Sequence, residues 1–150
     1  MRVSVLWIGK TRLPGVAALT EEYGKRLQRY CDFHAQEIRE ARKRSGETSG
    51  AEQVMLSRSK DSYRVALDAA GRKWESAEFA RFLAKLRDRG GRGVSFCVGG
   101  AEGFSQGFRE QADLLLSLSP LTFPHELARV VLLEQLYRAF TISAHHPYPR

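Results

Sequence analysis

The stretch VSFCVGGAEGFS, residues 94–105, places a short apolar run directly before a cluster of glycines. The run has the length and composition of a buried strand, and a helical pattern follows it. Glycines at the C-terminal end of a strand let a ligand approach the backbone closely, and open α/β sheets bind their ligands at this edge. A tight turn that requires positive φ explains the same glycines equally well. The spacing GGxxG matches neither the dinucleotide fingerprint nor the phosphate loop, so both of those sites are disfavoured.

Short apolar runs and longer amphipathic stretches alternate on both sides of these residues. The apolar runs predict strands at residues 3–8, 33–38, 63–68, 94–98 and 114–118. Helical spacing predicts helices at residues 15–30, 51–59, 76–89, 106–112 and 124–142, with Ser76 and Thr122 as caps of the third and fifth. This order is typical of an α/β fold with a mostly parallel sheet and helices on both faces. We expect one domain over residues 1–150, with a mobile polar loop at 42–50 inside it.

The charge balance points to an acidic partner. The chain has 24 Lys and Arg against 17 Asp and Glu, a net charge of +7. Its basic residues occur in local groups, such as those at 25–29, 39–44 and 87–92. Groups of arginine and lysine that gather on one face are typical of a nucleic-acid binder, because arginine binds phosphate with two parallel hydrogen bonds. An ordinary solvated surface is the alternative.

Neither a membrane nor a metal is indicated by the sequence. The N-terminal apolar run stops at Gly9 without a cleavage pattern behind it, and no run approaches the roughly 20 residues of a membrane span. Cys31 and Cys97 stand apart, without the spacing of a metal site or a disulfide framework. We therefore expect a cytoplasmic protein with no membrane partner and no bound metal.

The C-terminal third holds further candidate features. The stretch LSPLTFP, residues 118–124, carries two prolines whose irregular backbone can offer free C=O and N–H groups to an adenine edge, or can simply be a stiff connection. The last predicted helix is apolar around most of its circumference, which suits the core or a subunit interface. On it, Arg129 and Arg138 are candidates for contact with a ligand or with RNA phosphate, although Arg138 can also form a surface ion pair with Glu134. The tail at 143–150 combines aromatic and basic residues that suit single-stranded RNA, or it is a frayed terminus.

Several of these motifs occur together in one order. They are VxVxxIGK at residues 3–10, Leu67-Asp68 with Gly71-x-x-Trp74, VGGxEG at 98–103, LSxLTFPH at 118–125, Arg129-Val130 with EQLYRA at 134–139, and HPY at 146–148. In this order and spacing, the chain closely resembles the RlmH family from end to end. These are bacterial SPOUT-class methyltransferases that modify a pseudouridine in large-subunit ribosomal RNA.

The resemblance implies a fold, a cofactor and a reaction. The fold is SPOUT-type, an α/β sheet with a C-terminal trefoil knot, which is an exception to the rule that chains avoid knots. The cofactor is S-adenosylmethionine, and the enzyme is a homodimer. The reaction is methyl transfer to N3 of a pseudouridine in the loop of helix 69 of 23S ribosomal RNA, on the assembled ribosome.

The resemblance also assigns roles to residues. The expected cofactor-binding residues are Leu67, Gly99, Ser119, Pro120, Leu121, Thr122, Phe123 and Pro124. The expected catalytic residues are Arg138, His146 and Tyr148, with Arg150 as a further candidate, carried by a tail that reaches the pocket of the other subunit. The family ends with a histidine after Pro-Tyr, where this chain has Pro149, so no general base is assigned. His34 and His125 are expected to be structural.

Two other functions stay open at this point. One is a ribosome-binding protein without catalysis, against which the intact glycine and LSPLTFP loops argue. The other is a SPOUT enzyme that acts on another RNA, such as transfer RNA. Such enzymes commonly carry added RNA-binding domains, and 150 residues leave little room for one.

Overall fold

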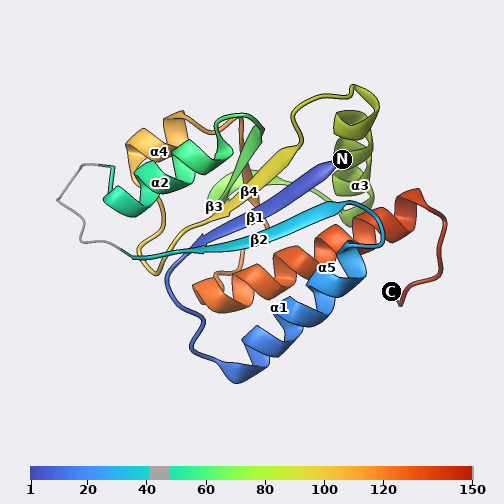
Figure 1. Cartoon of the computed structure of the whole chain (residues 1–150), viewed down its shortest axis with the longest axis horizontal. Helices are drawn as coiled ribbons and strands as arrows, with labels where there is room; N and C mark the ends of the chain where they lie inside the picture. The colour runs from blue at the N-terminus through green and yellow to red at the C-terminus, as the bar shows by residue number, and fades with distance from the viewer. Residues whose placement is uncertain (41–47, 150) are drawn as a thin grey trace.

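The computed structural model describes residues 1–40 and 48–149, and it contains one five-stranded sheet (Figure 1). Every strand pair in the sheet is parallel, and the strand order is β2-β1-β4-β3-β5. The strands are β1 Arg2–Ile8, β2 Asp32–Ile38, β3 Tyr63–Lys73, β4 Val94–Val98 and β5 Leu114–Ser117. The predicted α/β class and the parallel sheet are confirmed.

Helices cover both faces of the sheet, as predicted (Figure 1). They are α1 Pro14–Leu27, α2 Gly50–Ser59, α3 Ser76–Asp88, α4 Gln106–Glu110 and α5 His125–Ser143. Helices α1, α3 and α5 pack on one face, where alternate residues of β1 such as Val3 and Val5 enter the larger apolar core. Helices α2 and α4 cover the other face, where Leu6 and Ile8 enter a smaller core. The period-two alternation of side chains along β1 is what separates the two cores.

The largest difference from the sequence prediction is the length of β3. It was expected to end at residue 68, but it continues to Lys73 after a register shift between Leu67 and Arg72. The run DAAG lacks the apolar alternation that identifies a strand, so the pattern stops where the shift begins. Gly71 permits the extension, because a Cβ there would lie 2.6 Å from the backbone of Leu115 in β5.

Both predicted side-chain caps are wrong by position. Glu75, not Ser76, is the N-cap of α3: its backbone is extended, and its N–H donates to Glu78 at 2.8 Å. Helix α5 begins at His125 after Pro124 as N-cap, and Thr122 makes no cap hydrogen bond there. The ring of Pro124 fixes the backbone φ angle at the start of α5, so the helix begins there without a cap from the Thr122 hydroxyl.

Some expectations are not addressed by the described residues. The basic residues Arg42, Lys43 and Arg44, most of the expected loop at 42–50, and Arg150 lie outside them. The trefoil knot is a matter of chain threading, and it stays a prediction. Of the helices described, none is long and apolar enough to cross a lipid bilayer.

Candidate active site

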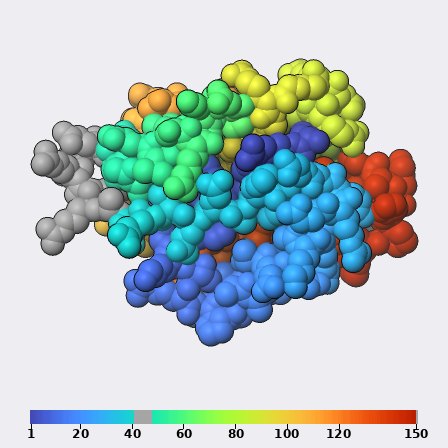
Figure 2. Space-filling view, viewed as in Figure 1, coloured from blue at the N-terminus to red at the C-terminus, as the bar shows by residue number. Residues whose placement is uncertain are grey.

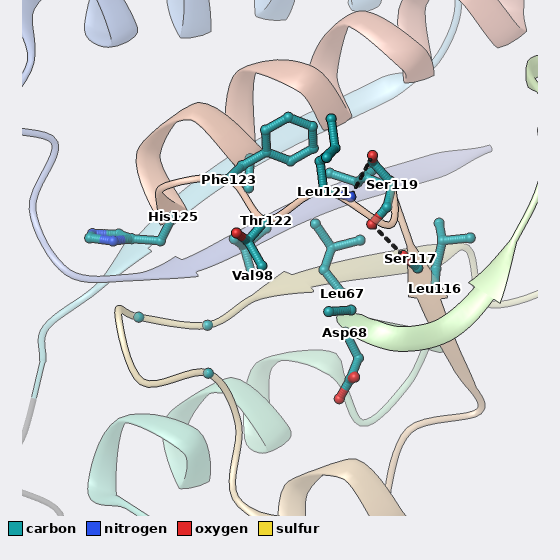
Figure 3. Close-up of a pocket in the computed structure, with 16 residues that line it drawn as sticks. Leu67, Asp68, Val98, Leu116, Ser117, Ser119, Leu121, Thr122, Phe123 and His125 are labelled. Carbon is teal, nitrogen blue, oxygen red and sulfur yellow. Dashed lines mark hydrogen bonds between the residues drawn. The ribbon is translucent and has the colours of Figure 1, made fainter.

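A recess opens at the C-terminal edge of the sheet, where β3, β4 and β5 end (Figure 3). Three loops surround it: the end of the regular part of β3, the glycines after β4, and the segment between β5 and α5. Its lining residues are Leu67, Asp68, Ala69, Val98, Gly99, Gly100, Gly103, Leu116, Ser117, Leu118, Ser119, Leu121, Thr122, Phe123, His125 and Ala128. This is the edge at which the sequence placed a ligand site.

Most of the expected cofactor residues meet in this recess. Leu67, Gly99, Ser119, Leu121, Thr122 and Phe123 all line it. Pro120 and Pro124 lie between and beside these residues in the chain without lining the recess themselves. Contact of any of them with a cofactor stays a prediction.

The loop after β5 is held by its own hydroxyl groups. The Ser117 hydroxyl donates to the Ser119 carbonyl at 3.0 Å, and the Ser119 hydroxyl accepts from the Leu121 N–H at 3.0 Å (Figure 3). Leu121 remains 74% exposed and Phe123 37% exposed at the rim, in a chain whose other large apolar side chains are mostly buried. The loop is therefore held by hydrogen bonds among its own residues, and it presents the partly exposed side chains of Leu121 and Phe123 at the rim.

The glycine loop on the opposite side of the recess is tightly folded. A Cβ on Gly99 would lie 3.2 Å from the backbone of Gly103, whose own φ is +72°. The interpretation as a tight turn is therefore confirmed, and contact of the same glycines with a ligand stays a prediction. The buried carboxylate of Glu52 fixes the far end of the loop by accepting from the Ser105 N–H at 2.8 Å.

Three polar residues of the recess were not singled out as site residues from the sequence: Ser117, described above, Asp68 and His125. Asp68 forms an ion pair of 2.8 Å with Arg109 of α4 and accepts from the Ala70 N–H, so it ties β3 to α4 below the recess. His125, expected to be structural, lines the recess at the start of α5. The motifs that contain Asp68 and His125 were visible in the sequence, but only the fold shows which side chains reach the opening.

The expected catalytic residues form a second cluster at the other end of α5. The Tyr30 hydroxyl lies 2.7 Å from His146 Nδ1, and the Tyr148 hydroxyl lies 3.4 Å from that of Tyr23. Arg138 donates to the carbonyl of Pro149 at 2.7 Å, and its guanidinium lies 4.7 Å from the centre of the Tyr148 ring. The tail is thus anchored through residue 149, not frayed.

Aromatic rings of Tyr23 in α1, Tyr30 just after α1, and Tyr137 in α5 form the bed for this tail, and Tyr23 and Tyr30 were not predicted as site residues. The Tyr148 ring packs edge-on against the Tyr137 ring, with 4.8 Å between the ring centres. The centres of the His146 and Tyr30 rings lie 5.7 Å apart. Tyr23 and Tyr30 lie more than a hundred residues before the tail, at ordinary positions of an amphipathic helix and its end. Only the packing of α1 against α5 shows that they belong to the site.

The surroundings of Tyr148 keep its phenol neutral. Burial raises the pKa of Tyr148 to about 12, and the hydrogen bond with Tyr23 and the negative charge of Glu134 act in the same direction. The positive charge of Arg138 opposes them more weakly, because Arg138 is itself paired with Glu134 at 2.8 Å. That ion pair was predicted from the sequence. At neutral pH, Tyr148 can donate a hydrogen bond but cannot take up a proton as a phenolate.

Arg129 does not fulfil its expected functional role. Its side chain is 0% exposed, and it donates to the Thr11 hydroxyl at 2.9 Å while its guanidinium lies 5.2 Å from the Trp7 ring. Burial lowers the pKa of Arg129. An arginine enclosed in this way cannot reach an RNA phosphate, and it connects α5 to the end of β1 instead.

No metal site is apparent in the part of the chain that the structure describes, since no three His, Cys, Asp or Glu side chains there are placed to hold an ion. Cys31 and Cys97 are both free thiols. Burial raises the pKa of Cys97 to about 12 and that of Cys31 to about 11. Neither is therefore a thiolate at neutral pH.

Comparisons with known proteins match the whole chain. The family described as "Predicted SPOUT methyltransferase" matches residues 1–149. The chain is 42% identical over 154 residues to a ribosomal RNA large subunit methyltransferase H from Geobacter sp. (strain M21), covering 99% of this chain and 98% of the relative. It is 41% identical over 150 residues to the protein of the same name from Thermus thermophilus, covering 100% of this chain and 99% of the relative.

Solved structures share the fold at low sequence identity. A tRNA methyltransferase from Aquifex aeolicus has a TM-score of 0.60 at 16% identity, covering 100% of this chain and 74% of that chain. A protein from Legionella pneumophila, solved in complex with the bound cofactor SAM, has a TM-score of 0.52 at 11% identity, covering 95% of this chain and 66% of that chain.

Proposed function

Because this chain belongs to the SPOUT methyltransferase family, we propose that it transfers a methyl group from S-adenosylmethionine to large-subunit ribosomal RNA. The observation that carries this proposal is the match over the full length, at about 40% identity, to relatives named for that activity. The basic charge of the chain, +7, suits an RNA substrate, and such a substrate is found in the cytoplasm.

The recess at the C-terminal edge fits the cofactor. Leu67 and Leu116 offer an apolar wall for an adenine ring, and the irregular segment 118–124 offers backbone N–H and C=O groups for its polar edge. On the opposite side, the glycines after β4 leave the backbone open to close approach. We therefore place the cofactor in this recess, held by the six expected residues that line it.

The tail cluster supplies groups that can position a uracil ring for methyl transfer and stabilise its anion, with the proton released from N3 passing to solvent water. The bound cofactor supplies a methyl group that is already electrophilic, so the protein has to align the accepting nitrogen and assist loss of its proton. Arg138 can stabilise negative charge on the uracil carbonyls, and neutral Tyr148 can donate a hydrogen bond to the base. His146 is held by Tyr30 through Nδ1, so Nε2 is the ring nitrogen that remains for contact with the base. We propose N3 of the pseudouridine in the helix 69 loop, on the assembled ribosome, as the acceptor.

We further propose that the active site forms between two copies of the chain. The recess lies at the first residues of α5, whereas Tyr148 folds back onto Tyr137, twelve residues after His125. Twelve residues of helix span roughly 18 Å at 1.5 Å per residue. Because its own helix holds the tail that far from its own recess, Tyr148 can reach a cofactor only in a partner subunit.

Alanine substitutions in the tail separate catalysis from cofactor binding. His146→Ala and Tyr148→Ala are expected to abolish methylation of purified ribosomes while cofactor affinity, measured by calorimetry, stays within about twofold. Equal loss of both properties would refute the division of roles between tail and recess. Mass spectrometry of ribosomal RNA from a strain lacking the gene identifies the target, because one pseudouridine should lose its methyl group.

A further inference from the structure

A polar stretch of the sheet lies beside α2 on the face that carries α2 and α4. Side chains alternate along β1, so Arg2 and Ser4 point to the face opposite Val3 and Val5. In register with Ser4 lie His34 of β2 and Ser95 of β4. Parallel sheets normally have both faces covered by apolar helices, whereas here the packing of α2 is confined to the C-terminal half of the strands.

Three arginines from separate elements surround a hollow on this polar stretch. Arg2 comes from β1, Arg58 from the end of α2, and Arg92 from the loop before β4. The other lining residues are Ser4, Gln36, Asp61, Ser62, Val94 and Ser95. Figure 2 shows the dark blue start of the chain open to solvent between the cyan β2, the green α2 and the yellow segment before β4.

The arginines are exposed, and within residues 1–40 and 48–149 none of the three forms an ion pair. All three side chains are exposed to solvent, so burial does not explain their positions. Arg58 is directed over the hollow by donation to the Gln36 side chain at 3.2 Å. Within residues 1–40 and 48–149, the guanidinium groups of Arg2 and Arg92 have no ion-pair or hydrogen-bond partner. Three cations against the single carboxylate of Asp61 leave a positive site.

The floor of the hollow is rigid, and its serine hydroxyls already have hydrogen-bond partners within the protein. The hydroxyls of Ser62 and Ser95 bond each other at 2.7 Å, and Ser95 is 3% exposed in the middle of the sheet. Gly93, with φ of +79°, holds the loop that carries Arg92 against β1, since a Cβ there would lie 2.5 Å from the Arg2 carbonyl. A fixed polar floor under a ring of guanidinium groups matches a phosphate group, which accepts several charge-assisted hydrogen bonds.

The hollow lies at the same end of the molecule as the tail cluster. Asp32 donates its N–H to the Met1 carbonyl at 3.0 Å, next to Arg2, and the nearby Tyr30 holds His146. The two sites are on opposite faces of the sheet at its N-terminal edge.

We propose that Arg2, Arg58 and Arg92 form a binding site for a backbone phosphate of the ribosomal RNA, away from the target base. This inference rests on the proposed function for the identity of the RNA. The site contributes affinity and orientation of the ribosome, and it has no part in methyl transfer itself. Its contact is electrostatic, so it weakens with salt.

The test compares two variants that lose the same charge. Arg58→Gln/Arg92→Gln removes two cations from the hollow, and Arg81→Gln/Lys85→Gln removes two exposed cations from α3. We expect the first variant to bind purified ribosomes about tenfold more weakly than wild type at ~0.1 M salt. The slope of the logarithm of its binding constant against the logarithm of salt concentration should be smaller by about one, because about one fewer counterion is released. Its kcat and its melting temperature should match those of wild type. Equal affinity of the two variants overturns the site.

A second measurement identifies the ligand. Titration with inorganic phosphate should shift the backbone amide resonances of Val94 and Ser95 in wild type but not in Arg58→Gln/Arg92→Gln. Such shifts without any loss of ribosome affinity would assign the hollow to a free anion and overturn the RNA contact. Binding is measured apart from catalysis, so wild-type protein that binds ribosomes without methylating them would contradict the proposed function and not this site.

Discussion

Tyr148 lies in surroundings that oppose its ionisation, and its titration can be followed directly. Its native pKa of about 12 is above the ~10 of an unfolded tyrosine. As pH rises past 10, the unfolded chain loses this proton first, so the stability that the neutral phenol contributes is complete below pH 10 and declines toward pH 12. The phenolate absorbance of wild type minus that of Tyr148→Phe should show a midpoint near 12. A midpoint near 10 would mean that the tail is not packed as described.

Gly71 is required by the approach of two backbones. A Cβ at this position would lie 2.6 Å from the backbone of Leu115, which the sheet holds in place. We expect Gly71→Ala to lower the free energy of unfolding by about 2 kcal/mol or more, measured by urea denaturation. Gly15→Ala is the matched control, because Gly15 lies in α1 with no atom within 4 Å of the added Cβ, and it should be neutral or stabilising by about 0.5–1 kcal/mol.

Among the elements, α2 is connected to the glycine loop through one carboxylate. Glu52 is 0% exposed and accepts from the N–H groups of both Ser49, the N-cap of α2, and Ser105. Glu52→Ala leaves both donors without a partner in the interior, so we expect a loss of about 2–4 kcal/mol and weaker cofactor binding. Glu78→Ala removes the corresponding bond at the surface start of α3 and should cost about 1 kcal/mol or less. Equal losses in urea denaturation would contradict this account.

How much could be predicted from the sequence differs between elements for physical reasons. Strands β1 and β4 are almost continuously buried runs and β2 has apolar residues at both ends of its run, so the ends of these strands were predicted to within about one residue. The end of β3 could not be found, because it depends on a register shift that Gly71 permits only beside β5. The recess was predictable because glycines and prolines constrain the local backbone wherever they stand. The bed of the tail was not, since Tyr23 and Tyr30 acquire their role from the packing of two helices distant in sequence.

At the scale of the whole molecule, α5 determines how the two candidate sites can cooperate. Its middle residues Leu132, Leu133 and Leu136 are fully buried, so the helix is fixed in the core and cannot move its ends together. Leu127 and Ile142, near its two ends, are 44% and 40% exposed. The prediction that this helix serves the core is confirmed, whereas a shared role between subunits stays a proposal. Its exposed ends are where a partner would have to pack.

Mixing two inactive variants tests this arrangement. Tyr148→Ala removes the tail function, and Gly99→Val fills the recess beside Gly103; each variant alone is expected to be inactive. If sites form between subunits of a two-fold dimer, each mixed dimer has one site with both parts intact. Random exchange makes half of the dimers mixed, so about a quarter of wild-type activity should return. Sites built within one chain would stay inactive in every mixture, because each chain carries one defect. Mixing each variant with itself is the control, and methyl incorporation into ribosomes is the measurement.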